Sequence, residues 1–204
     1  MAGFVKSMTI ALALGLPLSS AACASQQERD PGYGQPSEYQ AEIDTYSRDE
    51  IVEATADFFG VTAEAAASAL ERVFVDLGRP VGYIAGEEVS GAIGVGLRYG
   101  EGYLTLKSDG EPQKVYWTGP SVGFDAGGNA SRVFTLVYDL RDVDRLYQRF
   151  PGVDGSAYFV AGLGVNYQRA DDITLAPIRS GVGFRLGANV GYLAYSRERN
   201  WVPF

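Results

Sequence analysis

The hydrophobic residues of this chain change their spacing near residue 80, from a helical period to a period of two. Before that point, Ser47-Arg-Asp-Glu50 is a capping-box sequence and predicts a short helix that ends at Gly60. Thr62 is suited to cap a second helix, which Gly78 and Pro80 would end. The residues predicted to face inward from these two helices are Ile51, Phe58, Phe59, Ala66, Leu70, Val73, Phe74 and Leu77.

From Val81 onwards the pattern predicts a series of short strands. Ser108-Asp-Gly-Glu111, Gly127-Gly-Asn129 and Asp171-Asp172 are turn signals, and the segment 143–150 has the pattern of one or two helical turns. Many short strands joined by tight turns indicate antiparallel pairing. The expected fold class is α+β: a small antiparallel β-barrel of about eight or nine short strands with N-terminal helices packed on it. The strand candidates are 81–86, 91–99, 102–107, 113–118, 121–127, 132–139, 156–167, 172–186 (with a break expected near Pro177) and 188–196.

Four stretches of the strand region share one template, in which apolar residues alternate with glycine and one polar residue takes the third small position. Successive side chains of a strand point to opposite faces, so each stretch has one bulky face and one nearly bare face. We expect the apolar faces to form the barrel interior and the bare faces to leave room for something to approach closely. The stretches are Gly94-Val-Gly96-Leu-Arg98-Tyr-Gly100, Ser121-Val-Gly123-Phe-Asp125-Ala-Gly127, Gly162-Leu-Gly164-Val-Asn166-Tyr and Gly181-Val-Gly183-Phe-Arg185-Leu-Gly187.

The polar residues of the template are candidates for a binding site. A buried arginine needs a carboxylate partner, and Asp125 is the expected one. Two interpretations stay open: an ion-pair network that satisfies itself, or an anion clamp in which one arginine binds a ligand carboxylate or phosphate. Arg179 adds a further positive charge. With the aromatic residues that could line a groove, the candidate ligand-binding set is Arg98, Asp125, Asn166, Arg185, Tyr99, Trp117 and Tyr192.

The adjacent carboxylates Glu87 and Glu88 are a second candidate pair. Neighbouring residues of a strand face opposite ways, so the two cannot easily act on one substrate. We expect them to be solvated or to cap a neighbouring element.

The first residues have the layout of an export signal. Lys6 precedes an apolar run, and small residues follow as far as Ala24. Cleavage within Ala22-Cys23-Ala24 would discard the chain's single cysteine. The alternative is a lipoprotein acylated on Cys23, although Ser20 stands where that motif usually has leucine. We therefore expect a signal peptide at 1–24, a flexible polar linker at 25–46 and a folded domain at 47–204.

Composition narrows the range of functions. The chain has no histidine, which excludes imidazole metal sites and histidine-based catalytic triads. The formal net charge of −8 argues against nucleic acid as a partner. No two carboxylates are convincingly placed for acid–base work. We therefore expect no enzymatic activity, no metal and no cofactor.

Several segments from about residue 46 to the C-terminus are distinctive. They are Gly82-Tyr-Ile-Ala-Gly-Glu-Glu88, Gly96-Leu-Arg-Tyr-Gly-Glu-Gly102, Val115-Tyr-Trp-Thr-Gly-Pro-Ser121 with Gly123-Phe-Asp125, Phe150-Pro-Gly-Val-Asp-Gly-Ser-Ala-Tyr158, and the stretch from Leu175 to Tyr192. Together they resemble the envelope-integrity protein family of alphaproteobacteria, long catalogued as a domain of unknown function. The resemblance implies a soluble periplasmic β-barrel that supports the cell envelope, and it assigns no catalytic residues.

A weaker likeness is to the SYLF lipid-binding domain, through Gly119-Pro-Ser-Val-Gly123. The basic lipid-binding segment of some SYLF proteins has no counterpart here. This likeness implies a lipid ligand.

The function expected from these features is that of a non-enzymatic periplasmic protein. It would bind a lipid or other amphipathic ligand in a groove, with Arg98 or Arg185 near the charged end. One alternative is an envelope scaffold or structural partner without a small ligand. Another is an integral outer-membrane barrel, although several strand candidates are shorter than the about 9–11 residues that membrane-spanning strands need.

Overall fold

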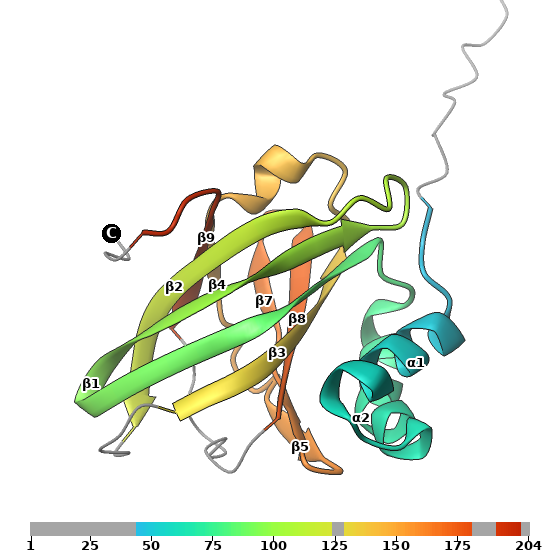
Figure 1. Cartoon of the computed structure of the whole chain (residues 1–204), viewed down its shortest axis with the longest axis horizontal. Coiled ribbons are helices and arrows are strands. Elements are labelled where there is room, and N and C mark those ends of the chain that lie inside the picture. The colour runs from blue at the N-terminus through green and yellow to red at the C-terminus, as the bar shows by residue number, and fades with distance from the viewer. Residues whose placement is uncertain (1–43, 124–128, 181–190, 201–204) are drawn as a thin grey trace, which may run out of the picture. The chain divides into compact units, whose positions relative to one another are not determined.

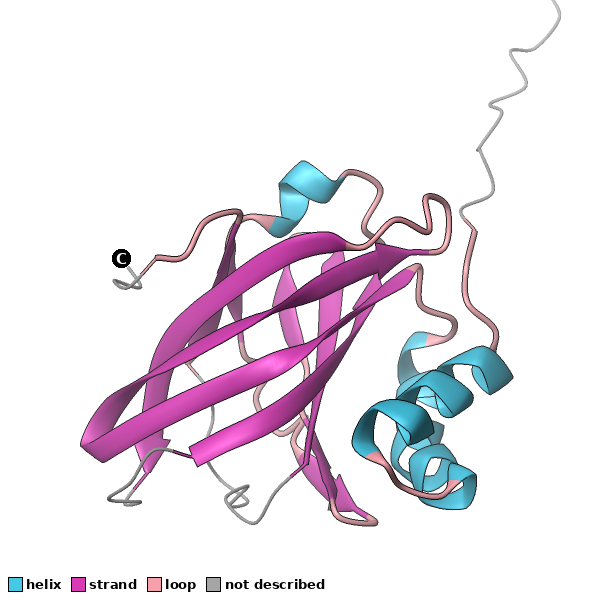
Figure 2. Cartoon of the chain, viewed as in Figure 1, coloured by secondary structure: helices cyan, strands magenta, loops and turns pink. Residues whose placement is uncertain are grey.

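In the part of the chain that the structure describes, two helices precede an antiparallel sheet, which confirms the expected α+β order (Figure 1, Figure 2). The computed structural model describes residues 44–123, 129–180 and 191–200. Its elements are α1 (Arg48–Phe59), α2 (Ala63–Leu77), β1 (Gly82–Leu106), β2 (Gln113–Gly123), β3 (Asn129–Tyr138), the 3₁₀ turn η1 (Val143–Leu146), β4 (Arg149–Pro151), β5 (Tyr158–Val160), β6 (Leu163–Val165), β7 (Gln168–Ala170), β8 (Ile173–Ser180) and β9 (Tyr192–Ser196).

The predicted caps form at both helices. The backbone N–H of Ser47 donates to the Glu50 carboxylate at 2.8 Å, and the N–H of Glu50 donates to the Ser47 hydroxyl at 3.3 Å. Glu50 also accepts from Lys107, the residue after β1, so the cap connects the first helix to the end of that strand. These bonds, that from Lys107 first, lower the pKa of Glu50 to about 2.

Replacing Ser47 with Ala should lower the free energy of unfolding by about 1 kcal/mol, the usual cost of losing a helix N-cap. Urea denaturation followed by far-ultraviolet circular dichroism measures the loss. The matched control is Ser68→Ala. The Ser68 hydroxyl donates back to the Glu64 carbonyl inside α2, and such bonds do not favour a helix. If both variants lose the same stability, the capping box contributes nothing.

The strand β1 doubles back on itself, as Figure 1 shows. Its first arm, 82–90, pairs with β3, and its second arm, 94–104, pairs with β2. The N–H of Lys107 donates to the Val81 carbonyl at 2.9 Å, which holds the two ends of the element together. The three strands expected between 81 and 107 are therefore one continuous element, whose two arms fold back on each other.

Within the described residues the nine strands run in the order β4-β9-β2-β1-β3-β8-β6-β5, and β7 pairs with β8. A β-bridge between Gly152 and Gln168 links the β4 edge to the β7 side, so the sheet curls back on itself into a barrel-like form. The expectation of an antiparallel barrel with packed helices is confirmed.

Several strand limits differ from those expected. The segment 156–167 is a hairpin of β5 and β6, with Ala161 and Gly162 in positive-φ conformations at the turn. Pro177 lies within β8 and does not break it. The segment 143–150 contains the η1 turn and then begins β4, whose Phe150 is fully buried. The parts of the expected strands at 124–127 and 181–190 lie outside the described residues.

The sheet has two differently covered faces. Its inner face packs around Leu104, Trp117, Val137, Phe150 and Leu175. The outer face of β3, β6 and β8 packs against Ile51, Leu70 and Val73 of the helices, as predicted. Two tyrosine hydroxyls reinforce this helix contact: Tyr158 donates to the Ala69 carbonyl at 2.9 Å and Tyr167 to the Asp76 carboxylate at 3.0 Å. Tyr83 and Ala85, at the start of β1, join this helix contact.

Candidate functional site

The glycine-bearing face of β1 points into the sheet's interior, opposite to what we expected. Gly100 lies beside Trp117 and Gly102 beside Val115, and both partners belong to the inner core. The apolar residue Leu97, on the other face, is 38% exposed. The bare faces therefore do not form a groove for a ligand: at the described positions the chain's own side chains and backbone close over them.

Gly100 shows why the template needs glycine. A Cβ atom there would overlap the indole ring of Trp117. The ring lies across the position that the missing side chain would take, and its Nε1–H donates to the Glu88 carboxylate at 3.0 Å. A Cβ at Gly82 would lie 2.7 Å from Leu106 Cδ2, and a Cβ at Gly102 would lie 2.5 Å from the Ala85 carbonyl oxygen. These glycines allow the close approach of neighbouring chain segments.

Glu88 is the centre of a buried ionic cluster. Its carboxylate accepts from Arg179 Nε at 3.2 Å and Nη2 at 3.4 Å, a bidentate contact, and lies 3.3 Å from Arg98 Nε. Arg179 Nη1 also donates to the Asn166 side-chain oxygen at 2.8 Å. The exposed fractions of the Glu88, Arg179 and Arg98 side chains are 3%, 6% and 12%. The cluster thus connects both arms of β1 with β2, β8 and the residue after β6.

The cluster is charged at neutral pH. Burial alone would raise the pKa of Glu88, but Arg179 and Arg98 together outweigh that effect and hold the pKa below its ordinary value. Burial lowers the pKa of Arg98, and the neighbouring Glu88 opposes that shift. Arginine keeps its proton under such conditions. Among the described residues, the cluster holds two guanidiniums against one carboxylate, and Arg98 Nη1 has no hydrogen-bond partner.

The expectation for Glu88 was wrong, since it is buried and paired rather than solvated. Strand alternation directs Glu87 outward and Glu88 inward, where two arginines from neighbouring strands compensate its charge. The sequence did hold a signal for this. Strand alternation, continued from Gly82 through Glu88, places Glu88 on the inner face, and the same alternation places Arg98 on the inner face of the second arm. Asp125, the partner expected for Arg98, lies outside the described residues, as does Arg185.

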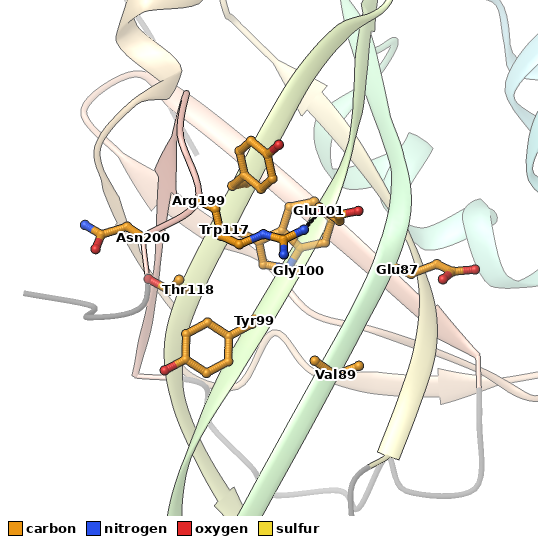
Figure 3. A pocket seen from close by; sticks show the side chains of 10 residues that line it. Glu87, Val89, Tyr99, Gly100, Glu101, Trp117, Thr118, Arg199 and Asn200 are labelled. Carbon is orange, nitrogen blue, oxygen red and sulfur yellow. Dashed lines mark hydrogen bonds and ion pairs between the residues drawn. The ribbon is translucent and has the colours of Figure 1, made fainter.

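A surface groove of about 250 Å³ lies on the opposite side of the sheet from the cluster. Figure 3 shows it over the two arms of β1 and over β2, with Arg199 and Asn200 contributed by the segment after β9. Tyr99 is paired with Thr118, and Glu101 with Tyr116, so the groove spans adjacent strands. The full lining is Glu87, Val89, Tyr99, Gly100, Glu101, Tyr116, Trp117, Thr118, Arg199 and Asn200.

An ion-pair network holds one wall of this groove. Glu101 pairs with Arg199 and, at 3.3 Å, with Lys114 Nζ. These two partners, Arg199 first, lower the pKa of Glu101, which is therefore ionised at neutral pH. Both cations also lie against the Tyr116 ring, Lys114 Nζ at 5.5 Å and Arg199 Cζ at 5.8 Å from its centroid. The segment after β9 is thereby attached to β1 and β2.

The structure separates the predicted site residues. Arg98 and Asn166 belong to the buried cluster, Tyr99 lines the groove, and Trp117 belongs to both, since its indole donates to Glu88. Tyr192 lies in neither, because its ring faces Arg149 at 5.3 Å, across the β4–β9 pair. Within the described ranges, no three carboxylates gather where they could hold a metal ion. No helix among these residues is long and apolar enough to cross a membrane.

The curved antiparallel sheet, the helix pair on one side and the buried Glu–Arg cluster define a class of small barrel-like protein. The chain belongs to the family of envelope integrity protein A (EipA), whose model matches residues 44–204. A crystal structure of an uncharacterized β-barrel-like protein from Brucella abortus is similar to it, with 51% sequence identity and a TM-score of 0.71. The match covers 78% of this chain and 99% of the Brucella chain. No curated protein matches the chain.

Family membership assigns the chain a role in cell-envelope integrity and locates it in the envelope. The resemblance seen in the sequence is thereby confirmed. The residues that match the family include the two helices, the ionic cluster and the described groove.

Proposed function

We propose that this protein is a non-enzymatic periplasmic component of the cell envelope that binds a lipid or another amphipathic ligand. The observation that carries the proposal is the groove over β1 and β2, which the exposed side chain of Val89 helps to line. Val89 is 52% exposed and Leu97 38% exposed. The groove itself joins apolar and aromatic carbon to charged and hydroxyl groups, so the surface offers an apolar part and a polar part side by side.

In this arrangement the apolar part of the ligand covers Val89 and Leu97, and its polar part enters the groove beside Glu101 and Arg199. This location replaces the one expected from the sequence, because Arg98 lies on the other face of the sheet. The absence of histidine and the pairing of Glu88 with two arginines support a binding role rather than a catalytic one. The export signal expected at 1–24 supports a periplasmic location.

Protein extracted from membranes and examined by native mass spectrometry should carry a lipid, and phospholipids should raise its melting temperature. Absence of both effects would overturn the proposal. In that case crosslinking in intact cells should show a dominant protein or peptidoglycan partner, which is the result a scaffold predicts.

The double variant Val89→Thr, Leu97→Gln should weaken binding to phospholipid vesicles about tenfold, since covering these side chains contributes about 1–2 kcal/mol. Vesicle co-sedimentation measures the change. Val75→Gln is the matched control, because Val75 is 80% exposed on α2 and lies outside the groove. Equal binding by both variants would place the lipid elsewhere.

A further inference from the structure

The lining of the outer groove joins aromatic rings to polar groups. Among the described residues its lining has one aliphatic side chain, Val89, together with tyrosine and tryptophan rings and carboxylate, guanidinium, hydroxyl and amide groups. Most of its exposed lining is carbon, and the polar groups stand beside the aromatic rings. Pockets lined by aromatic rings with a few placed polar groups fix a ligand by its faces and its hydrogen-bonding groups together.

The charges around the groove also balance. Glu87 and Glu101 are matched by Arg199 and by Lys114, which pairs with Glu101 from the groove's edge. A site for a phosphate or carboxylate would carry excess positive charge, and a site for an amine would carry excess negative charge. This balance favours an uncharged polar ligand.

Two tyrosine rings lie on adjacent strands within the groove, Tyr99 on β1 and Tyr116 on β2. Tyr116 is held in place by the two cations against it. Figure 3 shows Tyr99, Glu101 and Arg199 projecting from the same face. An aromatic ring has a negative face, which attracts the weakly positive C–H groups of a sugar ring. Planar carboxylate and guanidinium groups can each bond two neighbouring hydroxyls.

From these features we infer that the groove binds an uncharged sugar ring, carried either by an envelope glycan or by a glycolipid. This inference rests on the proposed function, because it names the polar part of the amphipathic ligand. The volume of about 250 Å³ lies just below the range typical of pockets for drug-sized molecules. It suits one or two rings, with the remaining ligand extending over Leu97 and Val89.

The experiment uses the full chain with two probes. Chitotetraose is titrated by calorimetry, and phosphatidylglycerol vesicles are compared with and without glucosyl diacylglycerol by co-sedimentation. The test variants are Tyr99→Leu, which removes the ring and keeps an apolar side chain, and Glu87→Gln, which removes an exposed carboxylate. The control is Tyr103→Leu, on the same arm and face, because Tyr103 is 50% exposed and outside the groove lining.

We expect the glucolipid to improve vesicle binding about tenfold, and Tyr99→Leu to abolish that gain while Tyr103→Leu retains it. If chitotetraose binds and the glucolipid gives no gain in vesicle binding, the sugar ring that the groove recognises belongs to an envelope glycan rather than to a glycolipid. Plain vesicles that bind as well as glucolipid vesicles, with no response to chitotetraose, would overturn the inference and leave the proposed function standing. Chitotetraose binding without vesicle binding would support the sugar site and overturn the lipid role. Binding to neither probe would overturn both.

Discussion

Replacing Glu88 with Gln should lower the free energy of unfolding by about 3–5 kcal/mol, the cost of leaving buried charges without their partner. Two guanidiniums, those of Arg98 and Arg179, would keep their charge in a site that is almost inaccessible to water. The side-chain amide of glutamine would also direct its own N–H donors toward one of these guanidinium groups, which can only donate hydrogen bonds. Urea denaturation of the variant and the wild type measures the difference.

Glu87→Gln is the matched control. The two glutamates are adjacent on the same arm of β1, but Glu87 is exposed whereas Glu88 is 2% exposed. The control should change stability by no more than about 0.5 kcal/mol. Adding Arg98→Met to Glu88→Gln should recover part of the loss, because one uncompensated charge is then removed. Equal stabilities of the two single variants would show that the cluster does not stabilise the fold.

The same cluster predicts a pH dependence with a definite sign. The folded-state pKa of Glu88 lies below the ordinary value of 4.5. Its contribution to stability is therefore fully present above about pH 4.5 and is lost as the pH falls through the lowered folded-state pKa. The stability difference between the wild type and Glu88→Gln should shrink over that acid range. A difference that grows on acidification would contradict the assignment of Glu88 as ionised.

Local signals were sufficient for the helices and for the sheet's general form. Ser47 bonds Glu50, three positions away, and Gly60 bonds the Ala56 carbonyl, four positions back, so the capping box and the helix end could be read directly from the sequence. The turn at Asp171 was likewise predicted, and Asp171 there adopts a positive φ. The antiparallel barrel followed from many short strands joined by tight turns.

The contacts that were missed depend on partners far away in the sequence. Whether the face bearing Gly100 is bare depends on Trp117, seventeen positions later on the paired strand, whose ring covers it. Whether Glu88 is solvated depends on Arg179, which is brought beside it through β3. The groove combines two arms of β1 with β2 and the segment after β9, which no local pattern brings together. Of its lining residues, the candidate ligand-binding set therefore included only Tyr99 and Trp117.

Gly100→Ala should lower the free energy of unfolding by about 3–5 kcal/mol. Overpacking a core commonly costs about 1–3 kcal/mol. Here the added methyl group would displace the Trp117 ring and break its bond to Glu88, and a hydrogen bond to a charged group contributes about 1.5–3 kcal/mol. Thermal and urea denaturation measure the loss.

The displacement of the ring has its own signature. In a background with Trp201→Phe, Trp117 is the only tryptophan, and Gly100→Ala should shift its fluorescence emission to longer wavelength as the ring leaves the core. Gly191→Ala is the control, since a Cβ there would meet Pro120 Cγ at an ordinary 3.6 Å. With Trp117→Phe, the cost of Gly100→Ala should fall, because the smaller ring leaves room for the methyl group. If Gly100→Ala leaves both the stability and the emission unchanged, the indole of Trp117 does not require glycine at this position. The explanation that the glycines of the template allow close packing would then be wrong for Gly100.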